Sequence, residues 1–265
     1  MTVSAAGAGG GAWAGVIGRL AVARRLLVAL DFDGTLAPLV ANPADSRPTP
    51  EAGAAMARLA RIPRVHLALV SGRPAADLAL LASPPDGVEL VGSHGAERGR
   101  VQAGRAVLEP VTLSPARAQR LRAVTDGLTA LAGGACGAWV ESKPFAAVFH
   151  TRPMPDRAAA AELEAQAAAL GKRLGGHVLP GKMVVEVSVL PTGKAAALAR
   201  LRQAADADRL VFAGDDTTDE LALRTIQPPD LGIKVGSGPT AAELRLPGPG
   251  AVAEFLQALA AAMER

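Results

Sequence analysis

The feature that most constrains the fold of this chain is an alternation of short apolar runs with Ala- and Leu-rich stretches of helical length. It occurs in the first hundred residues and resumes after Pro191. Because this alternation is typical of a parallel sheet covered by helices, we predict an α/β fold with a doubly wound, Rossmann-like parallel-sheet core. The expected strands are residues 26–30, 65–70, 88–92, 210–213 and 231–235, and the expected helices are residues 50–62, 75–81, 194–204, 221–225 and 251–263.

A segment with a different pattern, residues 109–189, interrupts this alternation. Here a helix is followed by two strands, and the same order is then repeated. This order predicts an α+β unit with an antiparallel sheet. We therefore expect a core of residues 12–108 and 190–265, an inserted α+β cap domain of residues 109–189, and a flexible tail of residues 1–11. The expected cap helices are residues 115–131 and 156–174, and the expected cap strands are residues 138–142, 146–152, 177–179 and 183–189.

Composition argues against several classes of function. The net charge is only +3, and the Lys and Arg residues are scattered, so we expect no nucleic-acid partner. Aromatic residues make up 3% of the chain, too few for the stacking platforms that bind single-stranded nucleic acid. No apolar run reaches the length of a membrane span, about 18 residues or more, so we expect no membrane partner.

Cysteine use and the N-terminal segment bear on location. The single cysteine, Cys136, excludes an intramolecular disulfide and favours a reducing compartment. The apolar segment 12–22 follows no basic residue and contains Arg19, so a secretory signal is not favoured. We expect a cytoplasmic protein that is a monomer or a weak homo-oligomer.

Two carboxylates follow the first expected strand directly. Asp31 and Asp33 lie where an open α/β sheet binds its ligands, beyond the carboxyl end of a strand. A spacing of two residues in an extended segment points both side chains to the same side. Neighbouring carboxylates repel unless a cation lies between them or one carries a proton. The pair therefore indicates a cation site or an acid–base site.

A second acidic cluster, residues 214–220, follows the strand expected at 210–213. Thr217 with Glu220 has the spacing of a capping box, so we expect these two residues to begin a helix. Asp215 and Asp216 precede that cap. Carboxylate oxygens suit Mg²⁺, so we expect these two residues to be metal ligands.

Two further residues fit an anion beside these acids. Ser71 ends the second expected strand, where its hydroxyl and the N–H of Gly72 could donate to a phosphoryl oxygen. Lys194 opens a helix, and both its ammonium group and the helix N-terminus favour an anion. Each residue alone is unremarkable, and only their spacing relative to the acids makes them candidates.

Taken together, these motifs resemble a known superfamily. D-x-D-G-T at 31–35, S-G-R at 71–73, the lone Lys194 and G-D-D-x-x-D-E at 214–220 resemble the haloacid dehalogenase-like phosphatases. More specifically, the chain resembles the trehalose-6-phosphate phosphatases in five segments, residues 93–97, 141–143, 150–152, 181–187 and 214–220. The long gap between Ser71 and Lys194 is where such a protein would carry its cap.

The resemblance implies an activity and a division of roles. The expected reaction is Mg²⁺-dependent hydrolysis of trehalose 6-phosphate to trehalose and phosphate. Asp31 would be the nucleophile that forms an aspartyl-phosphate, and Asp33 the acid and then the base. Ser71 and Lys194 would stabilise the phosphoryl oxygens. Mg²⁺ would be held by Asp31, the backbone carbonyl of Asp33 and Asp215, with Asp216 or Asp219 completing or orienting its shell.

The expected cap strands carry three charged pairs. Sequence spacing places the members of each pair on one sheet face, and we expect that face to bind the disaccharide hydroxyls; the pairs are Glu141 and Lys143, His150 and Arg152, and Lys182 and Glu186. The apolar residues of the other face should be covered by the cap helices. Since aromatic residues are few, hydrogen bonds should dominate sugar binding. Gly72, Arg73, His94 and Asp219 complete the expected substrate-binding set.

Two alternatives remain open from the sequence. One is a related capped phosphatase for sucrose phosphate, a mannosyl-phosphoglycerate or another sugar phosphate; the cap pairs argue against it. The other is a non-catalytic regulatory protein of the same fold. Such a protein is expected to have lost one of Asp31, Asp33, Lys194 or Asp215, and all four are present.

Overall fold

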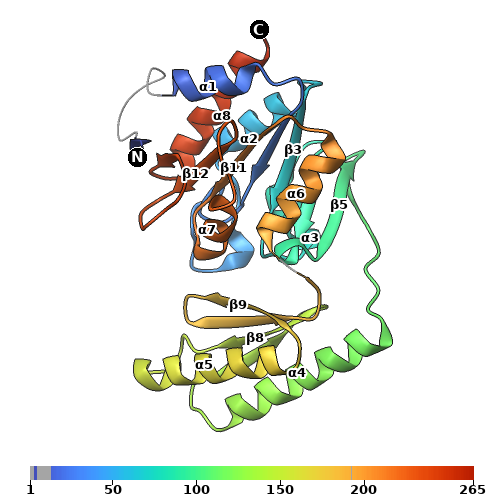
Figure 1. Cartoon of the computed structure of the whole chain (residues 1–265), viewed down its shortest axis with the longest axis vertical. Coiled ribbons are helices and arrows are strands. Elements are labelled where there is room, and N and C mark those ends of the chain that lie inside the picture. Colours follow the sequence, from blue (N-terminus) through green and yellow to red (C-terminus); the bar gives the residue numbers. More distant parts are fainter. Residues whose placement is uncertain (1–2, 5–12, 192) are drawn as a thin grey trace. The chain divides into compact units, whose positions relative to one another are not determined.

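A computed structural model describes residues 3–4, 13–191 and 193–265 (Figure 1). The chain divides into two compact units: a core unit of Met1–Glu109 with Gly193–Arg265, and a cap unit of Pro110–Thr192. The boundaries expected from sequence, 108/109 and 189/190, lie close to these. Within the expected flexible tail, Val3–Ser4 form strand β1, and the other residues lie outside the described ones.

The core unit contains one large mixed sheet. Its described strands run in the order β1-β13-β12-β11-β2-β3-β4-β5-β6, parallel from β1 to β4 and antiparallel from β4 to β6. Their bounds are β2 (Leu26–Leu30), β3 (Val65–Val70), β4 (Glu89–Gly92), β5 (Glu97–Gln102), β6 (Arg105–Leu108), β11 (Arg209–Gly214), β12 (Leu231–Val235) and β13 (Leu244–Leu246).

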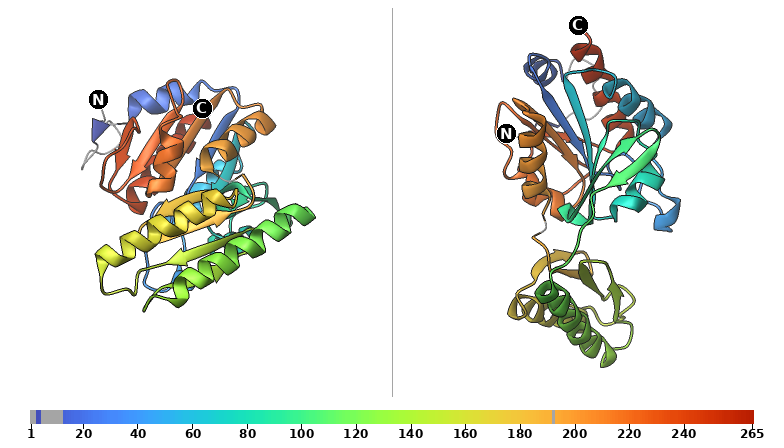
Figure 2. Two further views of the ribbon diagram at one scale, coloured as in Figure 1. Left: turned by 60° about the horizontal axis from the view of Figure 1, so that its bottom comes forward. Right: turned by 90° about the vertical axis from the view of Figure 1, so that its right-hand side faces the viewer.

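Helices cover both faces of this sheet (Figure 2, right). Strand β2 shows why: Leu26, Val28 and Leu30 point into one apolar cluster, and Leu27 and Ala29 point into the other. Buried residues of α1 (Ala14–Ala21), α2 (Pro50–Leu59), α3 (Ala75–Ala82) and α8 (Pro249–Met263) complete the first cluster. Those of α6 (Lys194–Ala205) and α7 (Thr217–Leu223) complete the second. This two-sided core confirms the predicted doubly wound fold.

Several helices begin at local sequence signals. Thr49 caps α2, its hydroxyl accepting from the Ala52 N–H at 3.2 Å, and Pro50 takes the first helical position. In the cap unit, Ser114 with Pro115 begins α4 (Pro115–Gly133) in the same way, and Asp156 caps α5 (Arg157–Arg173). These short polar residues satisfy N–H groups that have no partner within the helix.

Some elements differ from the sequence-based expectation. Helix α1 was not among the expected helices. The hairpin of β5 and β6 was not expected either, because β5 has the mainly polar sequence ERGRVQ and β6 is fully exposed at the sheet edge. Helix α7 begins at Thr217 rather than Leu221. The expected cap strand 146–152 ends at His150.

The cap unit has an antiparallel sheet in the order β7-β8-β10-β9. Helices α4 and α5 lie side by side over one face of it (Figure 2, left). Phe149, Val185 and Val187 point to these helices and are buried there, with Val140 packed against the same cluster, which confirms the predicted apolar face. The strand bounds are β7 (Trp139–Ser142), β8 (Ala146–His150), β9 (His177–Gly181) and β10 (Val184–Ser188).

Among the described residues, no helix combines the length and the hydropathy that crossing a membrane requires.

Candidate active site

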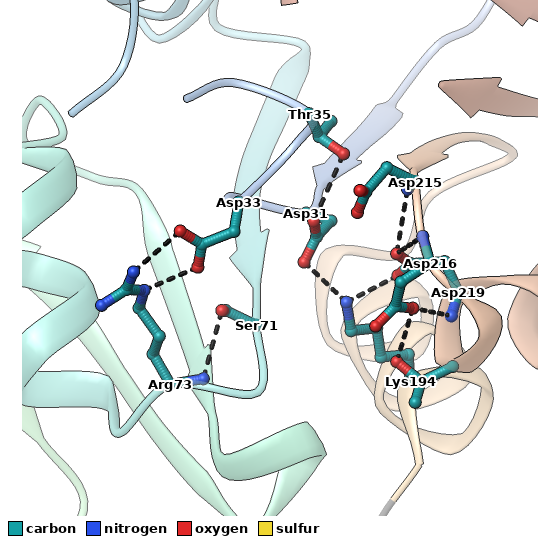
Figure 3. A network of polar contacts seen from close by, with 10 residues as sticks. Asp31, Asp33, Thr35, Ser71, Arg73, Lys194, Asp215, Asp216 and Asp219 are labelled. Atoms are coloured by element: carbon teal, nitrogen blue, oxygen red, sulfur yellow. Dashed lines mark hydrogen bonds and ion pairs between the residues drawn. The ribbon is translucent and has the colours of Figure 1, made fainter. Parts of the chain in front are cut away.

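Three neighbouring strands of the core sheet bring the predicted residues together. Asp31, Ser71 and Asp215 directly follow β2, β3 and β11, which are adjacent and parallel in the order β11-β2-β3 (Figure 3). The sheet hydrogen bonding continues one residue beyond β2 and β3: the Asp31 N–H donates to the Ala213 carbonyl at 2.9 Å, and the Ser71 N–H to that of Val91 at 2.9 Å. The carboxyl end of the parallel sheet therefore carries the acidic site.

Lys194 joins two buried carboxylates. Its ammonium group donates to Asp31 Oδ1 and to Asp219 Oδ1, both at 2.6 Å, and all three side chains are almost fully buried. Burial raises the pKa of Asp31 and of Asp219, and Lys194 only partly offsets this. Burial also acts to lower the pKa of Lys194, but the surrounding carboxylates outweigh it and raise that pKa, so the ammonium stays charged. Thr35 donates to the other Asp31 oxygen, Oδ2, at 3.2 Å.

Gly34 makes room for Asp215. It has a φ of +75°, and a Cβ at this position would lie 2.1 Å from Asp215 Oδ2, so only glycine fits here. Burial and repulsion from Asp219 and Asp216 raise the pKa of Asp215 to about 7. Within the described residues, the Asp215 carboxylate accepts no hydrogen bond, whereas its backbone carbonyl accepts one from buried Lys234.

The start of α7 differs from the predicted capping box. Asp216 is the N-cap, accepting from the Asp219 N–H at 2.8 Å, while Asp219 Oδ2 accepts from the N–H of Asp216 at 3.1 Å. Because Thr217 already has helical geometry, the predicted cap at Thr217 and Glu220 is wrong. Glu220 instead accepts from Thr240 Oγ1 at 2.8 Å and the Ala241 N–H at 2.6 Å.

Asp33 points away from the other acids and pairs with Arg73 (Figure 3). The guanidinium donates to both Asp33 carboxylate oxygens, Nε to Oδ2 at 2.6 Å and Nη2 to Oδ1 at 2.8 Å. Buried Ser46 donates to Oδ1 at 2.8 Å. Arg73 also lies over the Phe32 ring, 5.7 Å from its centroid. These contacts fix the orientation of the Asp33 carboxylate.

The loops after β3 and β4 pack on each other. The Ser71 hydroxyl accepts from the Arg73 N–H at 3.2 Å, and the His94 N–H donates to the Ser71 carbonyl at 3.0 Å. A Cβ on Gly72 would lie 2.5 Å from the His94 ring, so glycine permits this close packing. His94 has a φ of +52°. Its carbonyl accepts from the Gly193 N–H at 2.7 Å, which ties this loop to the start of α6.

In the cap unit, the charged residues pair across strands rather than along them. Lys143 donates to Glu186 Oε2 at 2.7 Å, and His150 Nε2 lies 3.0 Å from Glu141 Oε2. In the register, Glu141, Val148 and Glu186 form one row on the same face of the sheet. Arg152 lies after β8, so its expected place within a strand is wrong, whereas Lys143 and Lys182 lie in the β7–β8 and β9–β10 turns, between the expected strands. The side chains of Arg152 and Lys182 are exposed.

Comparisons with known proteins agree with this geometry. Residues 29–249 match the trehalose-phosphatase family. The chain belongs to this family. It is 32% identical to a trehalose-phosphate phosphatase of Mycobacterium marinum over 261 residues, covering 89% of this chain but only 62% of that protein. It is 30% identical to the trehalose-6-phosphate phosphatase of Escherichia coli over 244 residues, covering 89% of this chain and 86% of that protein.

Solved structures support the fold of this trehalose-phosphatase family member. The trehalose-6-phosphate phosphatase of Aspergillus fumigatus superposes with a TM-score of 0.71 at 24% identity, over 93% of this chain and 96% of that one. Sequence identity at this level supports the architecture alone. The roles of individual residues therefore rest on the site geometry of this chain.

The arrangement of acids in this family member suits a hard divalent cation. Asp31, Asp215 and Asp219 each offer an oxygen within 4.8 Å of the other two. Their raised pKa values reflect burial and mutual repulsion, which a cation would relieve. The side chains of Asp33 and Asp216, both in the predicted metal set, lie outside this group. Asp33 is held by Arg73, and Asp216 caps α7.

Sequence reasoning missed three polar side chains of this site. Thr35 has no individual role in the sequence prediction, Ser46 lies in a loop with no periodic pattern, and Lys234 is not among the predicted site residues. Only Lys234 carries a usable sequence signal, since it interrupts the apolar strand LGIKV. A charged residue inside a buried strand requires a partner, here the Asp215 carbonyl.

Proposed function

We propose that this chain hydrolyses trehalose 6-phosphate to trehalose and phosphate, with Mg²⁺, through an aspartyl-phosphate on Asp31. The observation that carries the proposal is the buried Asp31–Lys194–Asp219 arrangement beside Asp215 at the carboxyl end of the sheet. Membership of the trehalose-phosphatase family supports the substrate.

The contacts of the core residues support the roles proposed for them. An Asp31 oxygen forms a bond to phosphorus as the bond from phosphorus to the sugar oxygen breaks. Asp33 donates a proton to that oxygen, then takes a proton from the water that releases phosphate from Asp31. Lys194 and the Ser71 hydroxyl, with the N–H of Gly72, stabilise charge on the phosphoryl oxygens.

The metal proposal rests on the acid cluster. Asp31, the Asp33 carbonyl and Asp215 would hold Mg²⁺, with Asp219 orienting them through Lys194 and the N–H groups of residues 215 and 216. When bound, Mg²⁺ supplies the positive charge that lets an anionic phosphate approach Asp31.

The sugar-recognition proposal rests on the polar face of the cap sheet. Glu141, Lys143, His150 and Glu186 gather there, Lys143 in an ion pair with Glu186 and His150 hydrogen-bonded to Glu141, and the second oxygen of each carboxylate can accept from a sugar hydroxyl. We propose that Arg152, Lys182 and His94 contribute as well.

We also propose that the protein is cytoplasmic. Cys136 is a free, exposed thiol, and such a thiol is typical of a reducing compartment.

Phosphate release from a substrate panel tests the proposal. The panel contains trehalose 6-phosphate, sucrose 6-phosphate, a mannosyl-phosphoglycerate and glucose 6-phosphate, each with Mg²⁺ or EDTA. We expect a preference for trehalose 6-phosphate and loss of turnover in EDTA. Preference for another sugar phosphate would refute the substrate, and equal rates in EDTA would refute the metal requirement. A folded protein without turnover would support the regulatory alternative.

The nucleophile has its own test. Asp31→Asn keeps the size of the side chain but replaces the nucleophilic carboxylate by a neutral amide. Turnover should therefore fall at least about a thousand-fold, to background. Circular dichroism should be unchanged. Retained turnover in this variant would rule out the covalent route.

A further inference from the structure

The cap sheet carries an aromatic stack in which the proposed function uses His150 but not Trp139. Trp139 of β7 lies opposite His150 of β8, with ring centroids 4.0 Å apart and planes 6° from parallel. Alternation along β7 places Trp139 on the same face as Glu141. The stack therefore lies on the polar face of the cap sheet, away from α4 and α5.

The indole ring remains largely accessible. Trp139 is 47% exposed, and it is the one aromatic residue among the exposed large apolar side chains of the described residues. Strand β7 is at the edge of its sheet, so one ring face contacts His150 and the other has no neighbouring strand. Such a ring offers a flat apolar surface to a ligand.

The orientation of this ring is fixed from behind. A carboxylate can only accept, so His150 donates its Nε2–H to Glu141 Oε2 at 3.0 Å. The imidazole plane is thereby held, and the parallel indole is held against it. A preorganised ring loses little conformational freedom when a ligand binds.

Apolar and hydrogen-bonding groups lie together here. The row Trp139–His150–Val184 is flanked on the same face by the row Glu141–Val148–Glu186. A pyranose ring has the matching chemistry, because its C–H groups carry partial positive charge toward an aromatic face while hydroxyl groups surround its rim. Carboxylates beside the stack can accept from those hydroxyl groups.

We propose that Trp139, supported by His150, is a pyranose-stacking residue that holds a sugar ring of the substrate on the cap unit. This inference rests on the proposed sugar-phosphatase function and adds a specificity-determining residue to it. It also adds an aromatic contact to the expectation that hydrogen bonds dominate sugar binding.

Kinetics of Trp139→Ala and Trp139→Phe test the role. Loss of the ring should raise KM for trehalose 6-phosphate about ten-fold, with a smaller effect on kcat, and phenylalanine should restore most of the loss. The specificity ratio, kcat/KM for trehalose 6-phosphate over that for p-nitrophenyl phosphate, should fall by a similar factor. Val107→Ala, an equally exposed apolar residue on β6, is the matched control and should keep the wild-type ratio.

A binding measurement separates this inference from the proposed function. In a Trp13→Phe background, Trp139 is the only tryptophan, and titration with free trehalose should change its emission saturably. If the wild type hydrolyses trehalose 6-phosphate but Trp139→Ala keeps its KM and ratio, the stacking role is wrong and the function stands. If no sugar phosphate is hydrolysed, the function is wrong, and the titration alone decides: saturation supports stacking, and unchanged emission overturns it.

Discussion

Asp33 is the residue whose surroundings say most about the chemistry. A bidentate guanidinium partner and a buried hydroxyl leave its carboxylate a single orientation. An acid–base group benefits from this because proton transfer depends on its position. The sequence predicts that Arg73 binds substrate; its observed contacts are with Asp33, and we propose that it positions that carboxylate.

Arg73→Lys tests that positioning role. Lysine keeps the charge but not the two parallel hydrogen bonds, so kcat should fall about ten-fold or more, with a smaller change in KM. The matched control is Arg58→Ala, which removes an exposed pair with Glu264. An unchanged kcat in Arg73→Lys would show that Asp33 is held without the guanidinium.

The raised pKa of Asp215 predicts a pH-dependent stability difference. Between its ordinary value of 3.8 and about 7, this carboxyl keeps its proton in the folded protein and loses it in the unfolded one. Stability therefore falls as pH rises across this range. Asn cannot titrate, so the unfolding free energy of Asp215→Asn does not fall in this way. In EDTA it should therefore rise relative to that of the wild type between pH 4 and pH 7.

Urea unfolding of both proteins at several pH values measures this difference. A gap that stays constant with pH would show that Asp215 titrates normally. At pH 8, added Mg²⁺ should raise the melting temperature of the wild type more than that of Asp215→Asn, because the variant lacks one proposed ligand charge.

At the scale of elements, the start of α7 shows how a cap and a site share residues. Asp216 and Asp219 close the capping box, and Asp219 also binds Lys194. The position of the first helical turn thus sets the position of the acids. The sequence prediction placed this cap one residue too late, at Thr217 with Glu220, whereas the observed box is Asp216 with Asp219.

Two alanine variants distinguish these boxes. Asp216→Ala should cost about 1 kcal/mol of unfolding free energy, as for loss of an N-cap, and Thr217→Ala only a few tenths. Chemical denaturation with EDTA present removes any effect of metal binding. A larger cost for Thr217→Ala would restore the box predicted from sequence.

Sequence patterns predicted the strands that are buried on both faces and the strands that bury one face. The buried runs LLVAL and VHLALV, and the alternation that buries Phe149 and Val187, each have a clear period. Strands β5 and β6 have none, since they form an exposed edge. The acids Asp31 and Asp215 were predictable because they directly follow such strands. The contacts of Asp33 with Ser46 and Arg73 were not, because they depend on tertiary packing.

At the scale of the whole molecule, the two units have separate apolar cores. The cluster of Phe149 shares no residue with the clusters on either face of the core sheet. Each unit also contains one of the two tryptophans: Trp13 packs against Phe255 in the core unit, and Trp139 stacks on His150 in the cap unit. Each unit therefore contains its own fluorescent reporter.

Phe149→Ala should destabilise the cap unit by about 3–5 kcal/mol, as for loss of a fully buried aromatic ring. In single-tryptophan backgrounds, the transition reported by Trp139 should shift to lower temperature, and that reported by Trp13 should move much less. Phe212→Ala is the matched variant in the core, with the opposite pattern. Equal shifts of both reporters would show that the units unfold as one.

The central strand pair of the core has a consequence for biosynthesis. Strand β2 pairs with β11, Leu26 opposite Arg209, so the whole cap is synthesised between two neighbours in the sheet. Pairing so distant in sequence closes a long loop and is slow, whereas the cap is one continuous segment that can fold while translation proceeds. Asp31 is synthesised before the cap segment and Asp215 after it. We therefore expect the acidic site to be assembled last, and a chain released before β11 would contain the whole cap segment but lack Asp215.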